Sequence, residues 1–180
     1  GAWSYSNGGP PVATDSIYNP PVDGPGNYRY TVLGAPPCGN DIAIITAMDA
    51  DHLDIYGTAA AMEDAFIGFS EKIRKGGILI RQFGLKRGNE LKADRQLTYS
   101  LQNESADVYG TNIRMMNGSY EFDVMMKDNK IDNVVLHMGG MHNVENVIAA
   151  IAAANSLGIE NEKIKSAVES FRGVKRRFEY

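Results

Sequence analysis

A group of polar side chains with metal-binding or proton-transfer chemistry follows a short apolar run. The run is Ile42 to Thr46, and Asp49, Asp51, His52 and Asp54 come after it within a few positions. In open α/β sheets, ligands bind in the crevice at the carboxyl ends of the strands. The pattern therefore marks a candidate metal or catalytic site, and the alternative is an ordinary turn, in which Asp side chains bond nearby backbone amides.

A second group of polar residues stands before an alanine-rich stretch. The sequence His142-Asn143-Val-Glu-Asn146 follows Gly139-Gly140. Asn143 and Asn146 are three positions apart, so a helix places them on one face. A carboxamide donates and accepts hydrogen bonds at once, as the N6/N7 edge of adenine requires. The alternative is that Asn serves only as a helix cap after a Gly-Gly turn.

The third group is basic and stands near the end of the sequence. Phe171-Arg-Gly-Val-Lys-Arg176-Arg177-Phe-Glu179 follows a predicted helix. Guanidinium groups grip phosphate oxygens with two parallel hydrogen bonds and stay charged. The alternative is a solvated helix end, where cations are favoured by the helix dipole.

Regular elements surround these groups from Ile42 onward. The run Ile42 to Thr46 is nearly continuous in hydrophobicity, which predicts a strand buried on both faces in a parallel sheet covered by helices. Thr58 is the expected N-cap of the next helix, and Gly76-Gly77 its expected end after Arg74 and Lys75. This helix has an apolar face at helical spacing (Met62, Ala65, Phe66, Phe69 and Ile73), and strands are predicted at 78–80 and 96–101.

The pattern then changes to one typical of antiparallel strands. Asn117-Gly118 is a strong hairpin turn signal, and a second turn is expected at Asp128-Asn129. Two amphipathic helices follow, which are expected to end at Gly158 and Gly173. The predicted fold is α/β, a parallel sheet flanked by helices with a small three-stranded antiparallel meander; the meander strands are expected at 108–115, 120–126 and 131–138, and the two helices at 144–157 and 160–171.

Composition restricts the class of protein. The 180 residues suffice for one well-buried domain, and a net charge of −4 argues against a nucleic-acid partner. The single cysteine, Cys38, fits a reducing compartment. The sequence has neither a membrane-length apolar run nor a recognisable secretory signal, so a cytoplasmic protein is expected, with no membrane partner. Residues 1–40 hold all seven prolines and form a proline- and glycine-rich segment of unassigned role, in which only Tyr28 to Leu33 alternates like a strand.

The three groups, in this order, resemble the signatures of the Mur ligases, the ATP-dependent amide-forming enzymes of peptidoglycan precursor synthesis. The matching stretches are Ile45 to Thr58, His-Asn-x-x-Asn from His142, and Gly-Val-x-Arg-Arg-x-Glu from Gly173. The resemblance implies that His52 is a ligand to magnesium beside the ATP γ-phosphate. It also implies that the motif of His142, Asn143 and Asn146 contacts the adenine of ATP, and that Arg176 or Arg177 reaches the γ-phosphate.

Within that family, the stretch Asp51 to Thr58 is most similar to the member that joins L-alanine to UDP-N-acetylmuramate. The resemblance implies that residues 41–180 are the second half of the central domain. The family's Gly-Lys-Thr phosphate loop does not occur in these 180 residues, and Gly34 to Pro37 stands where a metal-binding acidic segment is expected. We therefore expect no turnover from these residues alone. The alternative is a non-catalytic, Mur-ligase-like module with at most weak nucleotide binding.

Overall fold

The computed structural model of the protein describes residues 2–5, 11–13, 28–31, 40–49 and 56–173. The chain divides into two compact units, Gly1–Asn40 and Asp41–Tyr180. Among the described residues, no helix is both long enough and apolar enough to cross a bilayer.

The first unit holds a small antiparallel sheet. Its strands are β1 (Ala2–Tyr5), β2 (Pro11–Ala13) and β3 (Tyr28–Thr31), in the order β2-β1-β3. The sequence predicted only the third of them. Proline lacks an amide donor and is tolerated on edge strands, which agrees with the position of Pro11 in β2 at the edge of this sheet.

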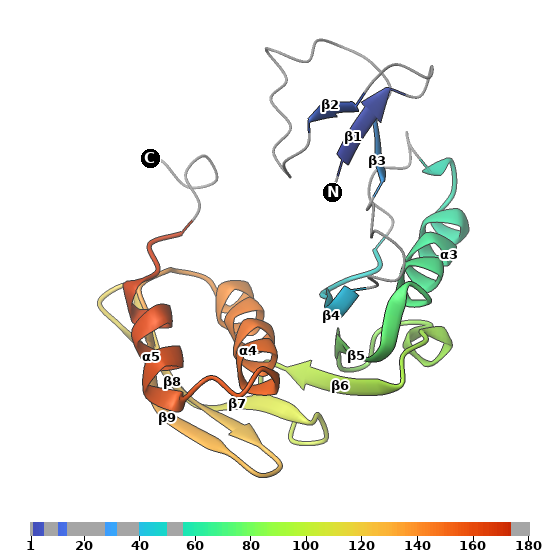
Figure 1. The fold of residues 1–180 in the computed structure, drawn as a ribbon. Coiled ribbons are helices and arrows are strands. Elements are labelled where there is room, and N and C mark those ends of the chain that lie inside the picture. Colours follow the sequence, from blue (N-terminus) through green and yellow to red (C-terminus); the bar gives the residue numbers. More distant parts are fainter. Residues whose placement is uncertain (1, 6–10, 14–27, 32–39, 50–55, 174–180) are drawn as a thin grey trace. The chain divides into compact units, whose positions relative to one another are not determined.

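The second unit is built on a six-stranded mixed sheet (Figure 1), which confirms the predicted fold class. Strands β5, β6 and β7 run parallel to one another, whereas β7, β8 and β9 form the antiparallel meander. The meander is continuous with the parallel strands, because β7 pairs with both β6 and β8. In sheet order the strands are β4 (Asn40–Ile45), β5 (Ile73–Gln82), β6 (Arg95–Ser100), β7 (Val108–Met116), β8 (Ser119–Met126) and β9 (Lys130–Leu136).

Helices cover both faces of this sheet. The helices are α3 (Ala59–Ser70), α4 (Met141–Ser156) and α5 (Asn161–Ser170), with a short 3-10 turn, η1 (Gly88–Glu90). Successive strand residues point to opposite faces. Ile78 and Ile80 accordingly belong to the core beneath α4, and Leu79 belongs to the second core, which Phe66 of α3 contacts.

The first helix begins as predicted but ends earlier. Thr58 caps α3 by accepting a hydrogen bond from the Ala61 backbone at 3.1 Å. The predicted end at Gly76-Gly77 is wrong, because α3 stops at Ser70 and both glycines lie inside β5. Arg74 and Lys75 are therefore strand residues. The backbone of Gly76 has a φ of +79°, a conformation that interrupts a helix and equally suits a distorted strand.

The prediction that Ile42 to Thr46 is buried on both faces is also wrong. Strand β4 lies at the edge of the sheet. Ala43 and Ile45 face the core beneath α3, whereas Ile44 points to the other face and is 41% exposed. An edge strand has only one neighbour, and α4 is packed on β5, β6 and β7. The hydrophobicity of Ile42 to Thr46 did not show that this strand lies at the edge of the sheet.

The meander follows its sequence pattern, with one exception. Asn117 and Gly118 both have positive φ (51° and 80°), as a two-residue hairpin turn of type I′ requires. Phe122 and Val124 are buried as predicted, but Asp123 between them is buried too. Irregular pairing on both sides of β8 turns its carboxylate inward.

Candidate nucleotide site

A pocket of about 670 Å³ lies between α4 and α5. Its walls are mostly small or aliphatic side chains, including Ala150, Ala154, Ile164 and Val168. At one end, three polar side chains from the first turns of α4 line the pocket: His142, Asn143 and Asn146. This volume and this lining, apolar with a few convergent polar groups, are typical of small-molecule sites. The sequence motif and the pocket therefore coincide.

A glycine turn sets the start of α4. Gly140 is the N-cap and has a φ of +93°, which L side chains rarely adopt. The imidazole of His142 folds against it, so that a Cβ on Gly140 would lie 2.6 Å from the Cε1 atom of His142. The positive φ makes any L side chain strained at this position, and a Cβ would also displace the imidazole of His142. This local packing keeps the imidazole at the pocket.

Asn143 lies inside the first turn of α4. Its backbone N–H donates to the Gly140 carbonyl at 3.0 Å, and its side-chain Nδ2 donates to the Gly139 carbonyl at 2.6 Å. The alternative in which an asparagine caps this helix is wrong, because the cap is Gly140. The Asn143 amide instead binds back to the turn that precedes the helix.

Asn146 lies one helical turn further along and lines the same pocket. Its side chain is exposed, and it has no hydrogen-bond partner among the residues that the structure describes. Its carboxamide can therefore offer both a donor and an acceptor to a bound ligand. Together with the apolar walls, this arrangement suits a flat heterocycle with adjacent donor and acceptor atoms.

Three residues at or beside the first turns of α4 were missed by the sequence reasoning: Gln82, Tyr99 and Glu145. Gln82, the last residue of β5, donates from Nε2 to the Oε1 atom of Glu145 at 3.1 Å. Tyr99 of β6 is buried, and burial, followed by the charge of Glu145, raises the pKa of its hydroxyl to about 12. Glu145 stands at the second unspecified position of the motif His-Asn-x-x-Asn. A signal existed only in Gln82, a polar residue at the end of an apolar strand.

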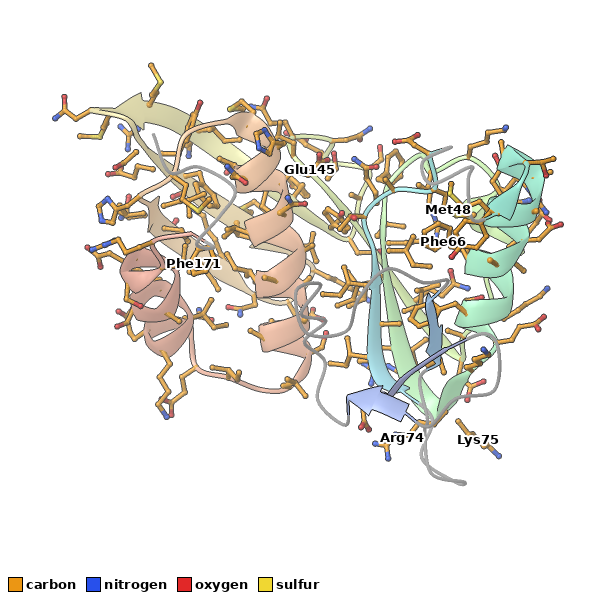
Figure 2. All side chains as sticks on the ribbon, turned by 90° about the horizontal axis from the view of Figure 1, so that it is seen from above. Met48, Phe66, Arg74, Lys75, Glu145 and Phe171 are labelled. Atoms are coloured by element: carbon orange, nitrogen blue, oxygen red, sulfur yellow. The ribbon has the colours of Figure 1, made fainter. Side chains whose placement is uncertain are left out.

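The first turns of α4 lie at one end of the sheet. Figure 2 shows Glu145 of α4 and Met48, which follows β4, toward one end of the strands. Arg74 and Lys75, at the start of β5, lie at the other end. Because β5 ends at Gln82, Glu145 meets the carboxyl end of that strand. This is the end at which open α/β sheets bind ligands.

The predicted metal ligand His52 and the predicted phosphate-binding pair Arg176 and Arg177 lie outside the described residues, as do Asp51 and Asp54. Of the acid-rich group only Asp49 is described, and it is exposed. Their roles stay predictions. In the ranges that the structure describes, no three His, Cys, Asp or Glu side chains gather in a way that could hold a metal ion.

An ion-pair network anchors α3, the helix that follows the acid-rich segment. The Glu63 carboxylate pairs with Lys86 and with Arg87, each at 3.1 Å, and Arg87 also contacts Asp64 and Glu90. The hydrogen bonds from Arg87 and Lys86 lower the pKa of Glu63. The hydrogen bonds that Arg87 donates to Glu90, Asp64 and Glu63, of which the one to Glu90 has the largest effect, raise the pKa of Arg87 above its already high ordinary value. The network fixes α3 to the loop after β5.

Comparisons with known proteins agree on one family. Residues 32–154 match the model of the Mur ligase middle domain. The chain is 40% identical over 139 residues to the UDP-N-acetylmuramate–L-alanine ligase of Phocaeicola vulgatus, a match that covers 77% of this chain and 30% of the relative.

Solved structures give the same result. MurF from Acinetobacter baumannii has a TM-score of 0.66 and 26% identity, with 76% of this chain and 30% of that chain covered. The UDP-N-acetylmuramate-alanine ligase MurC from Thermotoga maritima has a TM-score of 0.64 and 26% identity, with 78% and 31% covered. The matching part of the chain thus spans about 30% of the length of these relatives.

Proposed function

The chain belongs to the Mur ligase family, and we propose that it forms the adenine-binding half of the central domain of an ATP-dependent ligase that joins L-alanine to UDP-N-acetylmuramate. One observation carries the proposal. The family's His-Asn-x-x-Asn motif lines one end of a pocket with apolar walls, and the helical turn that carries the motif meets the carboxyl end of β5. The 40% identity to a ligase of this specificity supports the choice of substrates.

The pocket fits the base of the nucleotide. Its apolar walls would contact the two faces of adenine, and the polar side chains of His142, Asn143 and Asn146 stand where the edge of the ring can be recognised. When bound, ATP supplies the phosphoryl group that activates the carboxylate of UDP-N-acetylmuramate toward the amine of L-alanine. The base-binding residues contribute by holding the nucleotide in one orientation.

The remaining roles follow from the family. His52 would hold magnesium, and Arg176 or Arg177 would stabilise the negative charge that develops on the transferred phosphoryl group. We place the reaction in the cytoplasm, where ATP is available and where a lone cysteine such as Cys38 stays reduced.

A domain exchange tests the proposal. Residues 41–180 would replace the aligned segment of the Phocaeicola vulgatus ligase. The hybrid enzyme is expected to form the L-alanine product from UDP-N-acetylmuramate and ATP. Phosphate release and product formation are measured with L-alanine, with glycine and without an amino acid.

The control is the same hybrid with Arg176→Ala and Arg177→Ala together. It should fold with an unchanged circular dichroism spectrum and lose product formation by about 10² to 10³. A folded hybrid that makes no product, or one whose turnover does not depend on UDP-N-acetylmuramate, would contradict the proposed function.

A further inference from the structure

We propose that Asn117 is a modification site, at which spontaneous deamidation converts the turn between β7 and β8 into an aspartyl or isoaspartyl form. The turn is Asn117-Gly118, and it joins Met116, the last residue of β7, to Ser119, the first residue of β8. Asparagine is a thermolabile residue. The reaction consumes only water and releases ammonia, and it does not depend on nucleotide binding.

The chemistry takes place between two neighbouring residues. The backbone nitrogen of Gly118 loses its proton to solvent base and attacks Cγ of Asn117, and the bond from Cγ to the carboxamide nitrogen breaks with release of ammonia. Water then opens the cyclic imide. Cleavage of the ring bond between Cγ and the Gly118 nitrogen gives aspartate, and cleavage of the bond between the backbone carbonyl carbon and that nitrogen gives isoaspartate.

The attacking nitrogen, that of Gly118, is accessible. A Cβ built on Gly118 would have no other atom within 4 Å, so the space around this residue is open. In a two-residue turn the hydrogen bond that closes the turn comes from the residue after it, here Ser119, which pairs with Met116. The N–H of Gly118 makes no hydrogen bond within the described part of the chain. Its proton can therefore be lost without breaking such a bond.

The carboxamide of Asn117 is accessible as well. The residue is exposed, and its side chain has no hydrogen-bond partner among the residues that the structure describes. Ring closure requires rotation only about the backbone ψ bond and the side-chain χ1 bond of this one residue. Its φ of +51° lies in the left-handed region, which L residues adopt at a cost, so leaving this conformation releases part of that cost.

Other asparagines lack this combination of features. Asn103 is exposed too, but its Oδ1 accepts from the Ser105 backbone at 2.9 Å, and a residue with a side chain follows it. Asn155 lies in α4, and its Oδ1 accepts from another carboxamide at 2.7 Å. In the ranges that the structure describes, Asn117 is the only asparagine that a glycine follows. A second such pair, Asn7-Gly8, lies outside those ranges.

The modification would change the end of the hairpin. The isoaspartyl form carries the backbone through the former side chain, so an extra carbon enters a turn whose two residues both need positive φ. The neighbouring pair of Met116 and Ser119 would then lose its register. The Ser119 hydroxyl lies 2.9 Å from Nδ1 of His137, which stands in the connection from β9 to α4. The change would therefore extend from the turn to that connection.

Peptide mapping by mass spectrometry tests the proposal. The folded 180-residue chain is incubated in mildly alkaline buffer, and samples are digested with trypsin at intervals. Cleavage after Arg114 and Lys127 gives the peptide 115–127, in which Asn117 is the sole asparagine, whereas Asn7 falls in the peptide 1–29. The peptide 115–127 should gain the mass of an amide-to-acid exchange and split into two chromatographic products. Its conversion should precede that of Asn103 and should accelerate with hydroxide concentration.

Two variants and a free peptide complete the test. Asn117→Gln lengthens the side chain by a methylene, which disfavours ring closure, and should leave its peptide unmodified. Asn103→Gln, the matched control in another exposed loop, should leave the conversion of Asn117 unchanged. The synthetic peptide 115–127 gives the rate without the fold.

Two results would overturn the inference. If the folded chain stays unmodified over the time in which the synthetic peptide converts, the turn protects Asn117 and the site is wrong. If Asn117 and Asn103 convert at equal rates in the folded chain, the structure does not single out this turn. The effect on the hairpin is tested separately by NMR, because unchanged amide shifts of Ser119 and His137 in the modified chain would exclude it.

Discussion

At the scale of single residues, Asp123 is the charge on which the antiparallel strands depend. Its Oδ2 accepts from the Asn112 side chain at 2.8 Å, and its Oδ1 accepts from the Asn133 backbone at 2.9 Å. Asn112 and Asn133 both have a φ of +53°, on the two strands that flank β8. One carboxylate thus bridges two irregular positions of the sheet.

Replacing this carboxylate should destabilise the protein. Asp123→Asn presents an amide donor where two donors already converge, and we expect it to lower the free energy of unfolding by about 2 kcal/mol. Urea denaturation followed by circular dichroism measures the change. The control is Asp132→Asn, which removes an exposed carboxylate that pairs with Lys130. Equal effects of the two variants would contradict the bridging role.

The same residue should make stability depend on acid. Burial alone would raise the pKa of Asp123, but the hydrogen bonds from Asn133 and Asn112, aided by Lys130 and Arg114, outweigh it and lower the pKa. A lowered folded-state pKa stabilises the protein above the ordinary Asp pKa of about 3.9, and this stability is lost as the pH falls through the folded value. The wild type should therefore lose more stability than Asp123→Asn on acidification below about pH 4. Parallel losses would exclude the carboxylate as the cause.

The residue scale also shows what sequence reasoning could supply. The motif at His142 and Asn146 was found because polar residues at helical spacing stand out before an alanine-rich helix. The commitment of Asn143 to Gly139 was not predictable, since it depends on the direction of a backbone carbonyl in a glycine turn. The hydrogen bond between Glu145 and Gln82 was not predictable either, because the two residues lie far apart in the sequence.

At the scale of elements, two glycines illustrate how backbone conformation decides the effect of one substitution. Gly118 has a φ of +80° in the β7–β8 turn, whereas Gly68 lies within α3 with ordinary helical φ. Neither would bring a Cβ within 4 Å of another atom, so packing does not separate them.

The two alanine variants should therefore have opposite signs. Gly118→Ala forces an L residue into the left-handed region and should cost about 1 kcal/mol or more. Gly68→Ala should stabilise the protein by about 0.5–1 kcal/mol, since glycine is a poor helix former. Thermal unfolding compares both with the wild type. A stabilising effect of Gly118→Ala would show that the turn is not of type I′.

Elements were predicted well where periodicity was strong and poorly where position in the sheet mattered. The hairpin at Asn117-Gly118 and the helix capped by Thr58 follow from local turn and cap chemistry. The early end of α3 does not follow from such local chemistry, because Gly76-Gly77 can interrupt a helix or distort a strand. Here the two glycines lie in strand β5, which pairs with β6 from Ile78 onward. The exposure of Ile44 depends on which strands neighbour β4, which a local pattern does not encode.

At the scale of the whole molecule, the 180 residues by themselves are expected to be inactive. The family's phosphate loop does not occur in them, and they match about 30% of the length of the ligase relatives. Losing one preorganised contact in an active site costs about 10² to 10³ in rate, and here several are missing together. The chain is incubated with ATP, magnesium, UDP-N-acetylmuramate and L-alanine, and phosphate release is followed. Sustained release that His52→Ala abolishes would contradict this expectation.

The central claim is that the start of α4 binds the base of an adenine nucleotide, and one measurement tests it most directly. ADP is titrated into the isotopically labelled chain, and backbone amide chemical shifts are followed by NMR. The account predicts concentration-dependent shifts at residues 139–147 and at Phe171, with none in the β7–β8 turn at Asn117. Shifts confined to other regions, or no shifts at millimolar ADP, would contradict the assignment of this pocket to the nucleotide.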